Sequence, residues 1–168
     1  MQQRKAFTLV ELLVAMAIIG LLIGLSLFGI AAAQRNARDT ARRAAMQDIN
    51  AGIADYLTLE GAFPDRLRFA NDTVFIARNP ASVTATNCTA QNKCVAVPLD
   101  GAAVVGSGVD QTGGQNNSVL VVGQTSTNTS AFCFSTRSDG YSLAVRLENG
   151  DKADGGTSNT SCDPPALP

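Results

Sequence analysis

Residues Phe7 to Ala33 read FTLVELLVAMAIIGLLIGLSLFGIAAA, an apolar run that contains one carboxylate, Glu11, near its start. From Leu12 to Ala33 there are 22 consecutive uncharged residues. As an α-helix at about 1.5 Å per residue they would extend about 33 Å, close to the roughly 30 Å hydrocarbon core of a bilayer. The run therefore predicts a membrane-spanning helix.

A secretory signal peptide is the alternative, because Ala31 to Ala33 resemble its small-residue cleavage site. The apolar region of a signal peptide has about 7–15 residues, however, and this run is longer. A carboxylate near the centre of a spanning helix costs about 2.5–3.5 kcal/mol to insert, and less near an end. Glu11 is therefore expected to have a partner.

The composition favours a protein that is not an enzyme. The chain has 168 residues, a net charge of −1 and no histidine. Without histidine, the Ser-His-Asp and Cys-His nucleophile systems and histidine-containing zinc sites are excluded. The residues beyond the apolar run suffice for one modest soluble domain. We therefore expect a non-catalytic chain without a cofactor.

Four cysteines, Cys88, Cys94, Cys133 and Cys162, follow the apolar run and permit three pairings. Zinc is the competing interpretation, but four-cysteine zinc sites usually come as two closely spaced pairs, and the last two cysteines are far apart. Disulfides in an oxidising compartment are favoured, with Cys88 joined to Cys94 and Cys133 joined to Cys162. By chain entropy the longer loop would stabilise the domain by about 3–4 kcal/mol.

The leader, residues 1–6 (MQQRKA), contains Arg4 and Lys5 without an acidic residue, which indicates a cytoplasmic segment. More arginines follow the apolar run than precede it, so the positive-inside rule alone favours the opposite orientation. That orientation would place the cysteines in a reducing cytosol. We therefore expect a single-pass inner-membrane precursor with residues 61–168 outside the cytoplasm.

The string KAFTLVELLVAMAIIGLLIGL resembles the class III leader and N-terminal helix of type IV pilins and of the pseudopilins of type II secretion. In that family a short basic leader precedes a Phe-Thr-Leu-x-Glu-Leu segment. The resemblance implies that a prepilin peptidase cuts between Ala6 and Phe7 and methylates the new amino group of Phe7. It also implies that Glu11 acts in filament assembly. The family usually has glycine before the cut, where this chain has Ala6.

Elementary electrostatics supports a role for Glu11 in assembly. After the cut, the amine of Phe7 would lie about one helical turn from Glu11, or within reach of a neighbour's Glu11. Opposite charges attract strongly in low dielectric, although the attraction must offset their desolvation. The alternatives are that Glu11 lies in the interfacial region or stabilises the helix N-terminus through the dipole.

After Ala33 the sequence becomes amphipathic without a Gly-Pro break. Apolar residues recur every three to four positions, which predicts one stripe facing a core and an opposite face in solvent. The stripe comprises Met46, Ile49, Ile53 and Tyr56 or Leu57. The solvated face comprises Arg38, Arg42, Asp48 and Asp55.

The helix is expected to continue over residues 7–60, where Gly61 terminates it and Pro64 follows. The closing string YLTLEGAFP also resembles the end of the pilin helix. Within the lipid part, Gly20 and Gly24 form a G-x-x-x-G spacing. This spacing either lets neighbouring helices approach closely or eases unwinding outside lipid.

Four arginines cluster beyond the apolar run, at Arg35, Arg38, Arg42 and Arg43. A solvated face is the ordinary outcome of such a cluster. The alternatives are lipid headgroups before assembly, or DNA in an uptake pilus, both bound through phosphate contacts. No aromatic residue is interleaved to stack bases, which counts against DNA.

Beyond Pro64, short β-prone segments alternate with polar stretches. The segments are Thr73 to Ala77, Cys94 to Pro98, Val119 to Val122, Ala131 to Ser135 and Tyr141 to Leu147. We predict an α+β fold in which residues 61–168 form a small antiparallel sheet over the amphipathic helix half, with a cysteine-bracketed C-terminal loop. Residues 101–117 and 149–161, rich in Gly and Asn, are expected to be surface loops.

The tail contains one candidate metal site. Glu148, Asn149, Asp151 and Asp154 place oxygen ligands close together, as a C-terminal calcium loop does in some major pseudopilins that this chain resembles. The spacing matches no EF-hand, and a solvated acidic turn is the ordinary alternative.

These features together predict a structural subunit of a type IV pilus-like filament, made as a membrane precursor, cut and polymerised through its N-terminal helix. Its partners would be other pilin subunits, prepilin peptidase and, before assembly, membrane lipid. A surface pilus subunit is preferred over a type II secretion or competence pseudopilin, because paired cysteines suit an exposed, stress-bearing head. A single-span anchored binding protein that never polymerises is the alternative of another class.

Overall fold

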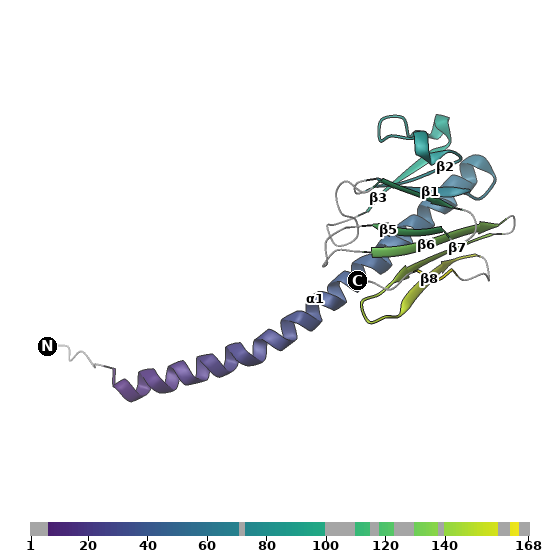
Figure 1. The fold of residues 1–168 in the computed structure, drawn as a ribbon. Coiled ribbons are helices and arrows are strands. Elements are labelled where there is room, and N and C mark those ends of the chain that lie inside the picture. Colours follow the sequence, from purple (N-terminus) through teal and green to yellow (C-terminus); the bar gives the residue numbers. More distant parts are fainter. Residues whose placement is uncertain are drawn as a thin grey trace. The chain divides into compact units, whose positions relative to one another are not determined.

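A computed structural model of the chain describes residues 7–70, 73–99, 110–114, 118–122, 130–137, 140–157 and 162–164. A long helix, α1 (Leu9–Glu60), is followed by strands that form two four-stranded antiparallel sheets (Figure 1). The predicted α+β class is confirmed, with two sheets where one was expected. The chain divides within α1 into two compact units, Met1–Ala37 and Arg38–Pro168, so the second unit includes the last part of the helix.

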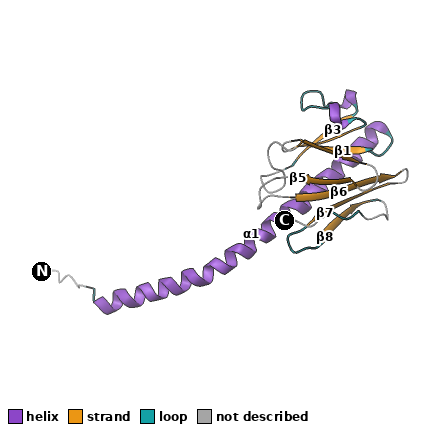
Figure 2. Ribbon diagram, in the orientation of Figure 1, coloured by secondary structure: helices purple, strands orange, loops and turns teal. Residues whose placement is uncertain are grey.

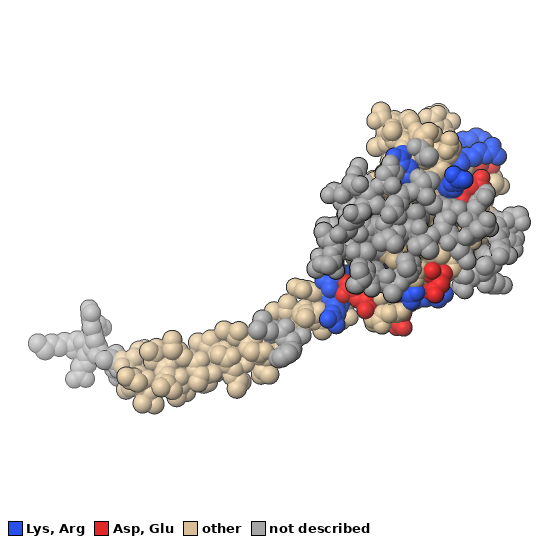
Figure 3. All heavy atoms as spheres, in the orientation of Figure 1, with Lys and Arg blue, Asp and Glu red and all other residues tan. Residues whose placement is uncertain are grey.

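The described part of the first unit, residues 7–37, consists mainly of the apolar part of α1. Its described large apolar side chains are exposed, from 86% at Phe7 to 49% at Val14. By length and composition α1 can cross a membrane, with a mean hydropathy of 2.6 over its most apolar window, none of which is buried. On the face shown in Figure 3 the described surface of this stretch is uncharged. The predicted apolar helix is therefore confirmed.

The first sheet has the strand order β3-β2-β1-β4. Its strands are β1 (Arg66–Ala70), β2 (Thr73–Ala77), β3 (Cys94–Pro98) and β4 (Asp110–Gly114). Two short 3-10 turns, η1 (Pro80–Ser82) and η2 (Ala90–Asn92), lie between β2 and β3. The predictions of β2 and β3 are confirmed to the residue, whereas β1 was not predicted. The prediction of a loop over 101–117 is wrong for β4, because pairing with β1 orders that segment.

The second sheet has the order β5-β6-β7-β8 (Figure 2). Its strands are β5 (Ser118–Val122), β6 (Ser130–Arg137), β7 (Gly140–Arg146) and β8 (Lys152–Gly156). The first three were predicted with small differences at their ends. The prediction of a loop over 149–161 is wrong for β8. Backbone pairing with β7 orders this segment and places its one apolar side chain, Ala153, in the core opposite Val145.

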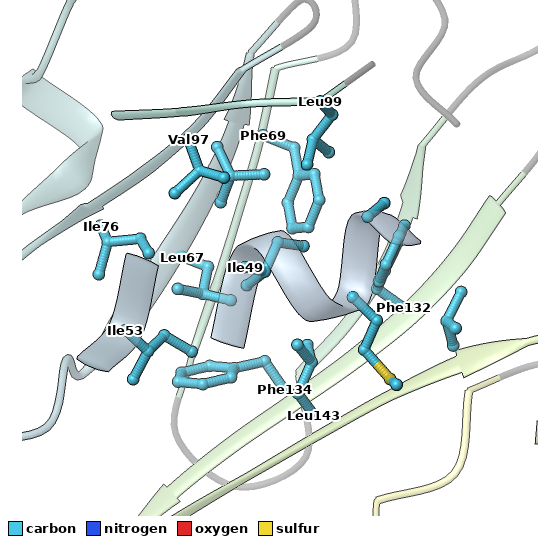
Figure 4. Close-up of a cluster of buried hydrophobic side chains, with 14 of the residues drawn as sticks. Ile49, Ile53, Leu67, Phe69, Ile76, Val97, Leu99, Phe132, Phe134 and Leu143 are labelled. Atoms are coloured by element: carbon cyan, nitrogen blue, oxygen red, sulfur yellow. The ribbon is translucent and has the colours of Figure 1, made fainter. Parts of the chain in front are cut away.

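The core of the second unit lies between the predicted stripe of α1 and both sheets. Figure 4 shows Ile49 and Ile53 of α1 among Leu67 of the first sheet and Phe134 of the second. Each side chain of this kind stabilises the fold by about 1.5–3 kcal/mol when it is fully buried. Tyr56 is the last stripe residue, since it is 1% exposed and its neighbour Leu57 is only half-buried.

Glycine at position 52 lets α1 approach the first sheet closely. A Cβ atom at Gly52 would lie 2.2 Å from Cγ2 of Val97 and 3.0 Å from Cδ1 of Ile76. At the end of the helix Gly61 adopts a left-handed conformation, with φ of 74°, and its N–H donates to the carbonyl of Leu57 at 2.8 Å. The predicted glycine terminator is confirmed.

All four cysteines are in disulfides, and both predicted pairs are confirmed. The Cα atoms of Cys88 and Cys94 lie 5.0 Å apart, and those of Cys133 and Cys162 lie 5.8 Å apart. Cys133 and Cys162 form a small buried cluster with Ala144, separate from the main core. The second bridge therefore fixes the C-terminal segment against the second sheet.

Candidate functional site

The N-terminus of α1 is closed by a reciprocal set of hydrogen bonds between Thr8 and Glu11. The backbone N–H and the hydroxyl of Thr8 each donate to Oε2 of Glu11 at 3.0 Å, and the backbone N–H of Glu11 donates to Oγ1 of Thr8 at 3.2 Å. Thr8 precedes the first helical residue, so the pair forms a capping box. It satisfies donors that the first helical turn would otherwise leave free.

The role of Thr8 was missed in the sequence, although the spacing Thr-x-x-Glu before an apolar run is the known indicator of a capping box. The geometry supports the alternative in which Glu11 stabilises the start of its own helix. It leaves the proposed assembly role untested, since no second copy is present. Phe7 is exposed next to this cap, and Ala6 lies outside the described residues.

The glycines of the apolar segment are not required by contacts within the chain. A Cβ atom at Gly20, Gly24 or Gly29 would meet no described atom within 4 Å. The hydroxyl of Ser26 donates to the carbonyl of Leu22 at 2.8 Å, so this polar group is satisfied within the helix. In the described residues, the segment thus presents an exposed apolar surface.

The arginine cluster divides into two pairs. Arg35 and Arg43 are exposed, whereas the side chain of Arg38 is 23% exposed and that of Arg42 is 1% exposed. The prediction of a solvated Arg38 and Arg42 is therefore wrong. Arg42 stands four residues before Met46, on the core-facing stripe, and this spacing was the available indication of its burial.

Glu148 is the acceptor that the two inner arginines share. Arg38 forms a two-point ion pair with it, through Nε to Oε1 and through Nη2 to Oε2 at 2.8 Å. Arg42 Nη1 lies 3.2 Å from Oε1 of Glu148 and 2.7 Å from Oδ1 of Asp39. The backbone N–H of Glu148 donates to the same Asp39 oxygen at 2.9 Å. We call Arg38, Asp39, Arg42 and Glu148 the ion cluster.

The ion cluster satisfies a buried charge that would otherwise be costly. The hydrogen bond from Arg38 lowers the pKa of Glu148 below its usual value of 4.5 and outweighs the opposing effect of burial. The charges of Arg38 and Arg42 lower it further. Glu148 is therefore ionised at neutral pH and tied to α1.

The candidate calcium ligands have other partners in this arrangement. Glu148 belongs to the ion cluster, Asn149 donates to Asp151 at 2.6 Å, and Asp154 pairs with Lys152 at 3.3 Å. Among the described residues, no three acidic or cysteine side chains group closely enough to hold a metal ion. Calcium binding in this turn stays a prediction without support from the geometry.

Residues 1–27 match the sequence family described as the prokaryotic N-terminal methylation motif. The match covers the leader, the Thr8–Glu11 cap and most of the apolar run, and it identifies this segment as a class III prepilin signal. Together with the apolar helix, this motif fits a membrane-anchored precursor of the type IV pilin kind. Searches of curated proteins and of solved structures found no match to the chain.

Proposed function

We propose that the chain is a structural subunit of a type IV pilus-like filament, cut between Ala6 and Phe7 by a prepilin peptidase and N-methylated on Phe7. The observation that carries this proposal is the methylation motif at the start of a helix whose described apolar side chains are exposed. Membrane lipid would cover these side chains in the precursor, and sister helices would cover them in the filament.

Association of apolar helices depends on close packing and on polar contacts, because lipid tails already satisfy apolar side chains. Gly20, Gly24 and Gly29, which no described contact within the chain requires, suit close packing between helices. Glu11 suits a polar contact, since cutting creates an amine at Phe7. In the precursor Glu11 accepts hydrogen bonds from Thr8, and in the filament it would in addition attract the amine of a neighbouring subunit.

We call the second unit, Arg38–Pro168, the head. It is proposed to face an oxidising compartment, because both disulfides lie in it. This supports an inner-membrane precursor with a cytoplasmic leader, and a filament outside the cytoplasm. The methylation motif suits a pilus and a type II secretion pseudopilus equally. The disulfide-fixed head favours the exposed pilus. Other copies of the chain or other pilins would be its partners, whereas DNA lacks support because two of the four arginines are engaged internally.

The test is mass spectrometry of the mature N-terminus, combined with electron microscopy of sheared cell-surface material. We expect a chain that begins with methylated Phe7 and that is recovered in filaments. A mature chain that retains Met1 would refute the cleavage. A cut, methylated chain that stays in the membrane without polymerising would identify an anchored binding protein, and filaments seen only with a secretion system would identify a pseudopilin.

A further inference from the structure

A groove of about 510 Å³ lies between α1 and β3, the edge strand of the first sheet. Gly52 and the buried side chains of Val97 and Leu99 line its apolar part. Asp48 and Asp55, both exposed, stand on its α1 side. All the lining residues belong to the second unit, so the groove is a feature of the head alone.

The two carboxylates of the groove have no counter-charge in the described part of the head. Among the described residues neither Asp48 nor Asp55 forms an ion pair. They are seven positions apart, which places them on one helix face with about 10.5 Å between them along the axis. A guanidinium midway between them would be about 5 Å from each position along the axis, within reach of both side chains.

Arg43 is the matching cation. It is exposed and, in the described part of the chain, makes no ion pair, whereas the ion cluster uses Arg38 and Arg42. An arginine also suits an apolar groove, since its stem covers apolar surface while its planar head binds carboxylates.

Arg43 forms one charged patch, and Asp48 with Asp55 forms the other. Their positions around α1 determine which kind of association between copies they favour. At about 100° per residue, Arg43 lies about 120–140° around α1 from Asp48 and Asp55. Complementary patches that face different directions favour a head-to-tail contact between copies over a two-fold dimer. Such a contact extends into an open polymer when its rotation does not close into a ring.

We propose that Arg43 of one subunit enters the α1–β3 groove of the next subunit and pairs there with Asp48 and Asp55. This inference rests on the proposed function as a filament subunit. It adds a surface through which neighbouring heads fix their offset along the filament. The apolar helices then supply most of the contact area, and the charged contact selects one offset between neighbours.

The first test is the double variant Arg43→Cys/Asp55→Cys in full-length filaments oxidised after assembly. Within one chain these positions are about 18 Å apart along a helix, too far for a disulfide, and the native cysteines are already paired. We therefore expect a ladder of disulfide-linked multimers on non-reducing gels. Each single variant should give monomers, or dimers at most.

The outcomes separate the inference from the proposed function. Intact filaments of the double variant that give only monomers overturn the contact and leave the proposed filament subunit standing. Cross-links to a different protein also overturn it. Absence of filaments from the wild-type chain overturns both proposals.

The second test reverses charge. Arg43→Glu should reduce the filament yield by about tenfold or more, and Arg43→Glu/Asp55→Arg should restore most of it. Arg66→Glu is the matched control, because Arg66 is also exposed and lies outside the groove. Equal yields for Arg43→Glu and Arg66→Glu, with both heads folded by circular dichroism, would overturn the contact.

Discussion

Nη1 of Arg42 lies 3.2 Å from Oε1 of Glu148, although the two residues are 106 positions apart in the chain. Arg42 opens the core-facing stripe of α1, and Glu148 lies in the turn between β7 and β8. The contact therefore ties the helix to the second sheet at a point where the apolar core ends. A guanidinium that is 1% exposed needs such partners, because an unpaired buried charge costs several kcal/mol.

We expect Glu148→Gln to lower the free energy of unfolding of the head by about 2–3 kcal/mol at pH 7, because it removes the carboxylate that Arg38 and Arg42 share. Denaturant unfolding of the detergent-solubilised chain, followed by near-ultraviolet circular dichroism, measures the change. Asp65→Asn removes an exposed carboxylate and is the control. A loss no larger than that of the control would show that the ion cluster contributes little to stability.

The effect of Glu148→Gln on the free energy of unfolding should disappear in acid. The folded-state pKa of Glu148 is lowered from 4.5, so its contribution is complete above the unfolded-state pKa and disappears as the pH falls through the lower folded-state pKa. The difference in stability between wild type and Glu148→Gln should therefore be constant near neutral pH and shrink below about pH 4.5. A difference that stays constant into that acidic range would contradict the assignment.

The capping box separates two roles of Glu11. Glu11→Gln retains a residue that can complete the box but removes the charge, and Thr8→Ala weakens the cap by about 1 kcal/mol but retains the charge. If the charge serves assembly, Glu11→Gln should abolish filaments and Thr8→Ala should permit them. Filament yield and helicity in micelles measure the two effects. Normal assembly of Glu11→Gln would leave capping as the role of this residue.

Gly52→Ala tests the close approach of α1 to β3. Alanine gains about 1 kcal/mol of helix propensity, but the contact of its Cβ atom with Val97 costs about 1–3 kcal/mol. We expect a net loss of about 1 kcal/mol in unfolding of the head, because the β-branched Val97 cannot easily move away. Gly20→Ala, whose Cβ atom meets no described atom within 4 Å, should leave head stability unchanged. If Gly52→Ala stabilised the head, β3 would have moved away from the new Cβ atom at little energetic cost.

The two disulfides should contribute unequally. Their sequence separations are 6 and 29 residues, so loop entropy assigns about 2.2 kcal/mol to Cys88–Cys94 and about 3.6 kcal/mol to Cys133–Cys162. Replacement of each pair by alanine, followed by denaturant unfolding, should reproduce this order. The second replacement should also release the C-terminal segment to proteolysis. The opposite order would indicate that native-state packing outweighs loop entropy.

Sequence reasoning located the elements that have strong local patterns. The apolar run, the stripe from Met46 to Tyr56, the Gly61 terminator and the strands β2 and β3 all follow from periodicity or residue type. Besides β1, it missed β4 and β8, which read DQTGG and KADGG. These segments have little intrinsic β-propensity, and only their pairing with a neighbouring strand makes them strands.

The sequence by itself determined the apolar run of residues 7–33 and the methylation motif of residues 1–27, because both follow from the local order of residues. Only the tertiary structure decided which charged side chains are buried and paired. Arg38, Arg42 and Glu148 read as solvated residues until folding brings positions far apart in the chain together, and the cost of burying a charge then requires that they pair. Arg43 stays exposed beside them, because one step around the helix turns it from the core to the surface.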